Sequence, residues 1–300
     1  MRIGVDLGGT KIEVIALDPA GQTLARWRCD APRDDYRATL RTVRQCVTRV
    51  ETEVGARGSV GIGTPGALSR VTGCLKNSNS TWLNGKPIVG DLERELGRPV
   101  RIANDADCFA LSEAIDGAAA GAGVVFGVIV GTGTGAGVVV HGRLLHGPNG
   151  IAGEWGHNPL PWPEEFEMPG PSCWCGKRGC IETYLSGPGM ADDHERATGS
   201  RMSAPDIVAR AAVGDDVCRE TLDRYVDRMA RSLAHVINIL DPDVIVLGGG
   251  MSNIDVLYEA VPKRWGRFVF SDAVATRLVR NVHGDSSGVR GAAWLWNRDA

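Results

Sequence analysis

One histidine and three cysteines form the group of residues in this sequence with the clearest chemical potential. They are His157, Cys173, Cys175 and Cys180. Thiolate and imidazole are ligands that Zn²⁺ takes readily, and a closed set of four leaves no open position for catalysis. Gly176 and Gly179 allow the tight turns that three converging sulfurs need. The spacing predicts a structural zinc site. The alternative is a set of free cysteines beside an unrelated histidine.

Two carboxylates flank the predicted zinc ligands. Glu154 lies three positions before His157, and Glu182 lies two positions after Cys180. A bound metal would hold both carboxylates in fixed positions, because its ligands fix the backbone on either side. We therefore expect a polar substrate pocket beside the zinc.

Length and composition limit the class of protein. A chain of 300 residues with 43% hydrophobic and 23% charged residues predicts a globular protein, and its length favours two lobes. A formal net charge of −3 gives no electrostatic reason to expect nucleic-acid or membrane binding. The chain opens without the pattern of a signal peptide, so we expect reduced cysteines and a cytoplasmic protein.

The uncharged segment 117–140 is long enough to span a bilayer, but its composition argues against a helix. Glycine recurs eight times in it, at 117, 121, 123, 127, 131, 133, 135 and 137. Glycine disfavours helix, whereas the valine-rich runs around 124–130 and 138–140 favour buried strands. The segment therefore predicts a hairpin of two strands around a glycine turn.

A similar strand, glycine turn and strand occur at the N-terminus, over residues 3–17. The two turns contain Gly8, Gly9, Thr10 and Lys11 in the first copy and Gly131, Thr132, Gly133, Thr134 and Gly135 in the second. We infer two lobes of similar plan whose turns present backbone N–H groups to phosphates. Neither turn matches a P-loop or a dinucleotide fingerprint. The alternative is that each glycine serves only a tight hairpin.

Helices and strands alternate over the rest of the chain. We expect helices over 34–54, 106–119, 205–212, 217–240, from about 254, and over 289–296, with strands over 59–63, 99–103 and 244–247. Gly248, Gly249 and Gly250 follow the last of these strands, where glycines let a phosphate or a planar ligand approach the backbone. A plain strand-to-helix turn is the alternative.

Asp105 is the candidate general base. It follows a predicted strand and begins a predicted helix, which is where catalytic side chains of α/β sheets often project. Capping of that helix by Asn104 or Asp105 is the alternative interpretation. The glycine turns, together with polar residues able to bind hydroxyl groups, favour catalysis: a base near a hydroxyl and a phosphate donor opposite is the geometry of phosphoryl transfer.

With these motifs the chain resembles the sugar kinases of the ROK family (repressor, open reading frame, kinase), within the actin-like ATPases. The resemblance rests on residues 6–11 and 131–135 as phosphate motifs, 247–250 as the adenosine motif, and 153–157 with the cysteine cluster as the sugar and zinc signature. Within the family, segments 32–36, 77–85, 158–162 and 283–291 are most similar to bacterial manno(fructo)kinase.

The resemblance implies an α/β, two-lobed actin-like ATPase (ribonuclease H-like) fold with an ATP and sugar cleft between the lobes. The expected lobes are 1–117, joined by the C-terminal helix 288–298, and 118–287. It also implies a homodimer. The implied activity is transfer of phosphate from ATP to the 6-hydroxyl of D-fructose, and of D-mannose, with Mg²⁺ and a structural Zn²⁺. Glucose and N-acetylhexosamines are the alternative substrates.

Residue roles follow from the same resemblance. Asp105 would deprotonate the sugar, Asp6 would hold Mg²⁺ through water, and His157 would bind both zinc and sugar. The implied sugar contacts are Gly66, Asn79, Asn104, Asp105, Glu154, His157 and Glu182. The implied nucleotide contacts are Asp6, both glycine turns with Lys11, and Gly248, Gly249 and Gly250.

Two non-catalytic classes compete with a kinase. ROK repressors bind DNA through an added N-terminal helix-turn-helix, whereas here the first phosphate motif begins within the first few residues. A sugar sensor without catalysis would leave Asp105 unexplained. We therefore expect a kinase.

Overall fold

The computed structural model describes residues 1–296, which form two compact units. The first unit contains Met1–Gly121, Gly137–Ala152 and residues from Val282 onward, and the second contains Ala122–Ala136 and Gly153–Asn281. This division differs from the expected lobes at residues 118–121, 137–152 and 282–287, which are expected in the second lobe but group with the first unit. Residues 137–152 do so because Gly137 and β10 (Arg143–Leu144) pack against helix α3 (Asp105–Ile115). Residues 297 and 298 of the expected C-terminal helix lie outside the described residues.

The secondary structure alternates as the sequence predicts. The strands are β1 (Arg2–Leu7), β2 (Lys11–Leu17), β3 (Thr23–Asp30), β4 (Ser59–Thr64), β5 (Ala67–Leu68), β6 (Leu75–Lys76), β7 (Val100–Asn104), β8 (Val124–Val130), β9 (Thr134–Val140), β10 (Arg143–Leu144), β11 (Val244–Gly248) and β12 (Arg277–Arg280). The α-helices are α1 (Tyr36–Val54), α2 (Ile88–Leu96), α3 (Asp105–Ile115), α4 (Glu182–Leu185), α5 (Gly187–Thr198), α6 (Ala204–Ala212), α7 (Asp216–Leu240), α8 (Leu257–Trp265) and α9 (Ser287–Trp294). Short 3₁₀ turns are η1 (Thr81–Leu83), η2 (Trp155–His157), η3 (Glu165–Glu167), η4 (Gly250–Asn253) and η5 (Gly284–Ser286).

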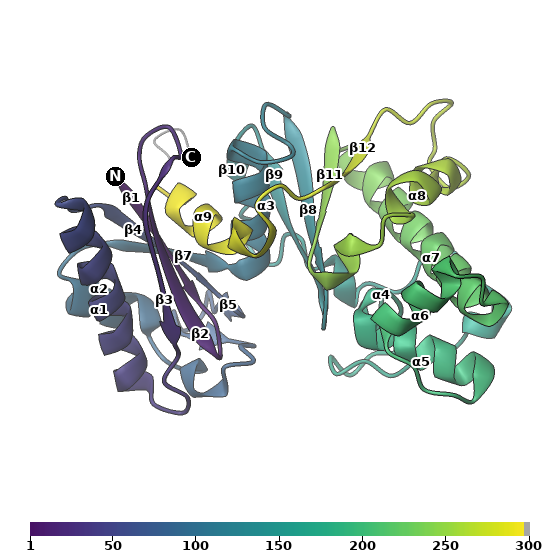
Figure 1. Ribbon diagram of the computed structural model, residues 1–300, viewed down its shortest axis with the longest axis horizontal. Helices are drawn as coiled ribbons and strands as arrows, with labels where there is room; N and C mark the ends of the chain where they lie inside the picture. Colours follow the sequence, from purple (N-terminus) through teal and green to yellow (C-terminus); the bar gives the residue numbers. More distant parts are fainter. Residues whose placement is uncertain (297–300) are drawn as a thin grey trace. The chain divides into compact units, whose positions relative to one another are not determined.

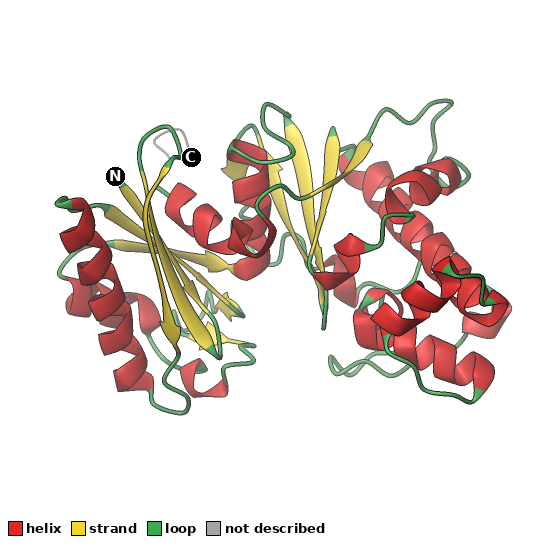
Figure 2. Cartoon of the chain, in the orientation of Figure 1, coloured by secondary structure: helices red, strands yellow, loops and turns green. Residues whose placement is uncertain are grey.

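Two five-stranded sheets share one strand order. Figure 2 shows the strands of both sheets in yellow, with helices in red beside them. The first runs β3-β2-β1-β4-β7, with the first three strands antiparallel and β4 and β7 parallel to β1. The second runs β10-β9-β8-β11-β12, and β11 is parallel to both β8 and β12. The repeated plan inferred from the two glycine turns is therefore confirmed. The first turn joins β1 to β2, and the second joins β8 to β9 at the same place in its sheet.

The uncharged segment forms strands, as expected. Residues 124–130 are β8 and residues 134–140 are β9, which neighbour each other in the second sheet. Within residues 1–296, no helix combines the length and the apolar character needed to cross a bilayer.

Helices cover both faces of the first sheet (Figure 1). On one face α1 buries a stripe that includes Leu40, Val43 and Val47, and the Asp35 side chain caps it by accepting from the Ala38 amide at 2.8 Å. On the other face α9 packs against β1 and β4, with α3 beside it. Glycine is required there: a Cβ on Gly61 would lie 1.8 Å from the Ala292 carbonyl oxygen. This contact seats α9 directly on the strand backbone.

The helices of the second unit surround α7, which packs against α4, α5, α6 and α8. A buried ionic cluster ties α7 to the proline-rich loop before the cysteines. Arg228 donates to Glu167 at 2.7 Å, and Arg231 donates to both carboxylate oxygens, at 2.8 and 2.9 Å. Burial alone raises the pKa of Glu167, but the hydrogen bonds from both arginines outweigh it and lower the pKa. Glu167 is therefore ionised and fully paired.

Several predicted elements need correction. Helix α3 ends at Ile115 rather than at 119, and the helix expected from about 254 is α8, which begins at Leu257. The sequence interpretation also missed α2, α5 and β12. Helix α2 and strand β12 are short, with nine and four residues, so they depend on packing more than on a local pattern.

Candidate functional site

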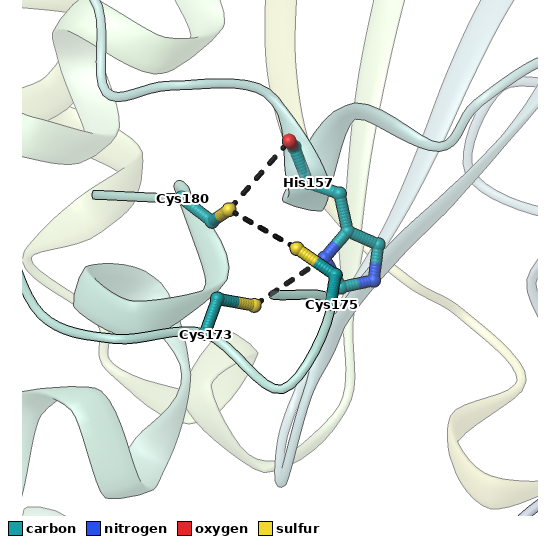
Figure 3. Close-up of side chains that lie close together, drawn as sticks. All are labelled: His157, Cys173, Cys175 and Cys180. Carbon is teal, nitrogen blue, oxygen red and sulfur yellow. Dashed lines mark hydrogen bonds between the residues drawn. The ribbon is translucent and has the colours of Figure 1, made fainter. Parts of the chain in front are cut away.

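The three cysteines and His157 converge within the second unit (Figure 3). Their four ligand atoms all lie within 4.8 Å of one another. The Cys173 Sγ is 3.6 Å from the His157 Nδ1, and the Cys175 Sγ is 3.6 Å from the Cys180 Sγ. Sulfur ligands about 2.3 Å from a tetrahedral Zn²⁺ lie a little under 4 Å apart, so the donor set fits this metal. The alternative of unrelated residues does not explain the convergence.

Backbone turns place these donors. Gly176 and Gly179 have positive φ angles of 86° and 68°, as their predicted role requires. The Cys173 amide donates to the Lys177 carbonyl at 2.8 Å, which closes the loop that carries Cys175. Burial raises the pKa of the Cys180 thiol to about 12, whereas the Lys177 backbone N–H lowers that of Cys175. Metal binding must deprotonate these thiols, so zinc affinity falls as the pH falls.

The three predicted sugar contacts of the second unit lie around the zinc ligands. His157 turns its Nδ1 toward the sulfurs, which leaves Nε2 on the opposite side of the ring (Figure 3). Glu154 is exposed and immediately precedes η2. Glu182 begins α4, and its two oxygens accept separate hydrogen bonds, from the Trp174 Nε1 at 2.7 Å and from the Thr134 amide at 2.9 Å.

In the first unit, parallel strands bring the candidate base and the candidate magnesium ligand to one edge of the sheet. Asp6 lies beside Gly63 near the end of β1, and Asn104 pairs with Thr64 at the ends of β7 and β4. Asp105 follows as the first residue of α3, with an exposed side chain. The carboxyl edge of parallel strands is the usual place for ligands in such sheets.

Asp6 and Asp105 influence each other electrostatically. Burial, and to a lesser extent the nearby carboxylates of Asp105 and Glu13, together raise the pKa of Asp6 to about 6. Two carboxylates at the edge of the sheet form an arrangement that a divalent cation stabilises, since it neutralises their repulsion. Oxygen ligands of this kind suit Mg²⁺.

Capping is the correct interpretation of Asn104. Its Oδ1 accepts from the Ala106 amide at 2.8 Å, and its Nδ2 donates to the Gly66 carbonyl at 2.8 Å. The side chain therefore fixes both the start of α3 and the loop at Gly66, whose φ of 85° requires glycine. The Asn104 carboxamide carries two N–H groups, so it has a second donor besides the one that binds the Gly66 carbonyl. Asn79 lies exposed in the loop between β6 and η1.

The first glycine turn joins β1 to β2. The Gly8 amide donates to the Lys11 carbonyl at 3.1 Å, and Thr10 and Lys11 have exposed side chains. A Cβ on Gly9 would lie 2.9 Å from the Ser80 Oγ, so glycine is required there. The turn is therefore tight, as the sequence predicts, and its role in phosphate binding stays a prediction.

The second glycine turn and the third glycine cluster line one cavity of about 1030 Å³ in the second unit. Gly131 and Thr132 contribute from the turn and Gly250 from the cluster. Gly249 serves packing instead, because a Cβ there would lie 2.4 Å from the Val130 carbonyl oxygen. Gly248 is buried at the end of β11. Gly249 thus has a packing role, whereas a role of Gly250 in ligand binding stays a prediction.

Most walls of this cavity escaped the sequence interpretation. They come from α5, from α6 and from the loop between them: Gly187, Pro188, Ala191, Arg201, Met202, Ser203, Ala204, Pro205, Val208 and Ala209. The Gly187 amide donates to the Gly131 carbonyl at 2.8 Å, which ties the start of α5 to the glycine turn. Ser203 before Pro205 is a recognisable helix start, but small apolar residues carry no local signal of a ligand. The cavity has the size and the mixed apolar and amide lining that a nucleotide needs.

Comparison with known proteins agrees with this architecture. The model of the ROK family matches residues 2–299. An N-acetyl-D-glucosamine kinase of Vibrio cholerae serotype O1 is 40% identical over 299 residues, covering 98% of this chain and 99% of that kinase. A ROK hexokinase from Thermus thermophilus superposes with a TM-score of 0.89 at 32% identity, over 100% of this chain and 99% of that one. A ROK glucokinase from Streptomyces griseus, solved with glucose and AMPPNP, gives a TM-score of 0.77 at 26% identity, over 100% and 99%.

Two similar sheets with glycine turns define a mixed α/β protein of the actin-like ATPase class, as expected. The chain belongs to the ROK family. The expected likeness to fructokinases is not supported by these comparisons: the curated relatives are N-acetyl-D-glucosamine kinases, which match the alternative substrate class.

If the four converging side chains bind zinc, the behaviour of a ligand variant can be predicted. Cys175→Ser should lose bound zinc and lower the melting temperature by about 5 to 10 °C, because metal binding contributes directly to folding. Metal analysis and thermal denaturation measure the two effects. Cys74→Ser, a thiol outside the cluster, is the matched control and should keep zinc and stability. A zinc-free Cys175→Ser protein as stable as its parent would contradict the assignment.

The raised pKa of Asp6 predicts a pH-dependent gain of stability in Asp6→Asn. An acid whose pKa is higher in the folded than in the unfolded state costs stability as the pH rises through this interval, here from about 4 to about 6. Without Mg²⁺ and nucleotide, the variant should therefore be more stable than the parent by about 3 kcal/mol at pH 8 and by about half as much at pH 5. Denaturant unfolding at both pH values tests this. Equal stability of the two proteins at pH 8 would refute the burial of a charged Asp6.

Proposed function

We propose that this chain is an ATP-dependent sugar kinase that phosphorylates the 6-hydroxyl of N-acetyl-D-glucosamine. The observation that carries the proposal is the 40% identity to N-acetyl-D-glucosamine kinases across 98% of the chain. The candidate base and every phosphate and zinc motif are present in this sequence. The nucleotide would occupy the cavity lined by Gly131, Thr132 and Gly250.

The proposed reaction divides its work between the carboxylates of the first unit. Asp105 would accept the proton of the 6-hydroxyl as its oxygen attacks the γ-phosphorus of ATP, and the bond from that phosphorus to the β,γ-bridging oxygen would break to release ADP. Asp6 would hold Mg²⁺, which neutralises charge on the transferred phosphoryl group when it is bound. The backbone amides of the glycine turns would bind phosphate oxygens.

The sugar would be held by carboxylate groups, which accept hydrogen bonds, and by imidazole and amide groups. Glu154 and Glu182 accept hydrogen bonds from hydroxyls, and the His157 Nε2 would contact the sugar while Nδ1 binds zinc. In the first unit the proposed contacts are Gly66, Asn79 and Asn104. The zinc serves structure in this proposal, since its four ligands leave no site for substrate.

A hexose without the acetamido group is the second candidate substrate. The hexokinase of Thermus thermophilus resembles this chain over its whole length, and the segments 32–36 and 77–85 resemble manno(fructo)kinase. Glucose, mannose and fructose therefore belong in the same test. One substituent changes discrimination by about 10-fold to 200-fold, so the preference is measurable.

A coupled assay of ADP release with Mg-ATP tests the substrate. We expect the kcat/KM for N-acetyl-D-glucosamine to exceed those for glucose, mannose and fructose by at least about tenfold. A preference for one of the three hexoses would keep the kinase and replace the substrate. Without turnover of any sugar, the chain would instead be a sensor of the kind considered from its sequence.

Asp105→Asn separates chemistry from binding. The variant should bind sugar and ATP as the parent does but lose about 10²-fold to 10⁴-fold in kcat, because the amide cannot accept the proton. Calorimetric titration and steady-state kinetics measure the two properties. Asp272→Asn, an exposed carboxylate before β12, is the control and should turn over normally. A near-normal kcat in Asp105→Asn would show that Asp105 is not the general base.

A further inference from the structure

Trp174 combines high exposure with specific polar contacts. It lies between the predicted zinc ligands Cys173 and Cys175, and 73% of it is exposed to solvent. Its Nε1 donates to the Glu182 Oε1 at 2.7 Å, and its ring stands edge-on to His157 with the centroids 4.8 Å apart. A large apolar ring gains little stability at such exposure. Its contacts therefore point to a task other than core packing.

We propose that Trp174 is a positioning residue that orients the Glu182 carboxylate for sugar binding, and that it links the zinc loop to that carboxylate. The inference rests on the proposed function, in which Glu182 contacts the sugar. An indole N–H only donates, so the Glu182 oxygen facing it must accept. The Thr134 amide donates to the other oxygen at 2.9 Å. Two donors on two different oxygens fix the rotation of the carboxylate.

The turn between β8 and β9 leaves room for the Glu182 carboxylate in this orientation. A Cβ on Gly133 would lie 2.8 Å from the Glu182 Oε2. The glycine turn thus both donates to the carboxylate and avoids a clash with it. The position of Glu182 is specified from two separate segments, the zinc loop and the turn between β8 and β9.

Each carboxylate oxygen keeps acceptor capacity for a sugar. A carboxylate has about four lone-pair directions, and the two hydrogen bonds described use one on each oxygen. The remaining directions can accept from hydroxyl groups. A carboxylate held in advance loses less entropy when it binds, so fixing it raises affinity.

The zinc loop fixes the indole in turn. The Gly176 amide donates to the Cys173 carbonyl at 3.0 Å, and the Cys173 amide donates to Lys177, so the backbone around Trp174 is a closed turn. Metal ligands on both sides of Trp174 would hold that turn rigid. The structural metal would thereby influence the sugar without touching it at this point.

Trp174→Phe tests the role, because it keeps an aromatic ring beside His157 and removes only the N–H donor. We expect the Kd for N-acetyl-D-glucosamine, and its KM, to rise about tenfold while kcat and the Kd for AMPPNP stay within twofold. Zinc content and melting temperature should match the parent. Trp294→Phe is the matched control: its Nε1 donates to the Asp116 Oδ2 at 3.1 Å, so it loses the same type of hydrogen bond in α9. It should leave the sugar Kd unchanged.

A double-mutant cycle decides whether Trp174 acts through Glu182. If it does, Trp174→Phe should weaken sugar binding by less than about twofold in a Glu182→Ala background, where no side-chain acceptor faces the indole. Additive effects, loss of zinc in Trp174→Phe, or an unchanged sugar Kd would each overturn the proposal. If the parent binds none of N-acetyl-D-glucosamine, glucose, mannose and fructose by calorimetry, the proposed function fails and the positioning role fails with it. Parent binding with an unaffected variant refutes the positioning role alone.

Discussion

The buried carboxylate of Glu167 supports much of the second unit. Its side chain is inaccessible to solvent and receives hydrogen bonds from Arg228 and Arg231 of α7. Removing one member of such a cluster leaves an unpaired buried charge, which costs about 3 to 5 kcal/mol. The cluster fixes the loop that leads to Cys173. The Tyr184 hydroxyl also donates to the Glu167 carbonyl at 2.9 Å, which joins this loop to α4, the helix that begins with Glu182.

A series of contacts leads from Glu167 through the predicted zinc ligands to Trp174 and Glu182. The loop fixed by Glu167 carries two cysteines, the turn between them carries Trp174, and Trp174 contacts Glu182. The same Glu182 contacts the Thr134 amide, next to the turn that lines the nucleotide-sized cavity. The predicted zinc ligands, the predicted sugar contact Glu182 and the predicted phosphate turn are thus connected by direct contacts within one unit. Such contacts give preorganisation, which lowers the cost of binding.

In the first unit, the backbone geometry of the sheet places the two carboxylates of the candidate site. Parallel strands place Asp6 near Asp105 at one sheet edge, where burial and mutual repulsion raise the pKa of Asp6 to about 6. Helix α9, seated on β1 and β4 through glycine contacts, returns the end of the chain to this unit. Repulsion between these two carboxylates lowers the stability of the fold, and a bound cation would relieve this repulsion. Groups placed for function often lower stability in this way.

The sequence by itself determined the repeated strand plan, and it predicted the zinc ligands and the candidate base, because each rests on local chemistry: glycine in turns, sulfur and imidazole ligands, and an acid after a strand. Local patterns could not give α2, α5 or the walls of the cavity, since ordinary apolar residues acquire a function only from their neighbours in space. Family likeness did not decide the hexose, because one substituent is recognised by placements that few residues control. Only the tertiary structure showed that Asn104 caps α3, that Gly249 serves packing while Gly250 lines the cavity, and that Trp174 reaches Glu182. These are contacts between segments that the chain brings together only by folding.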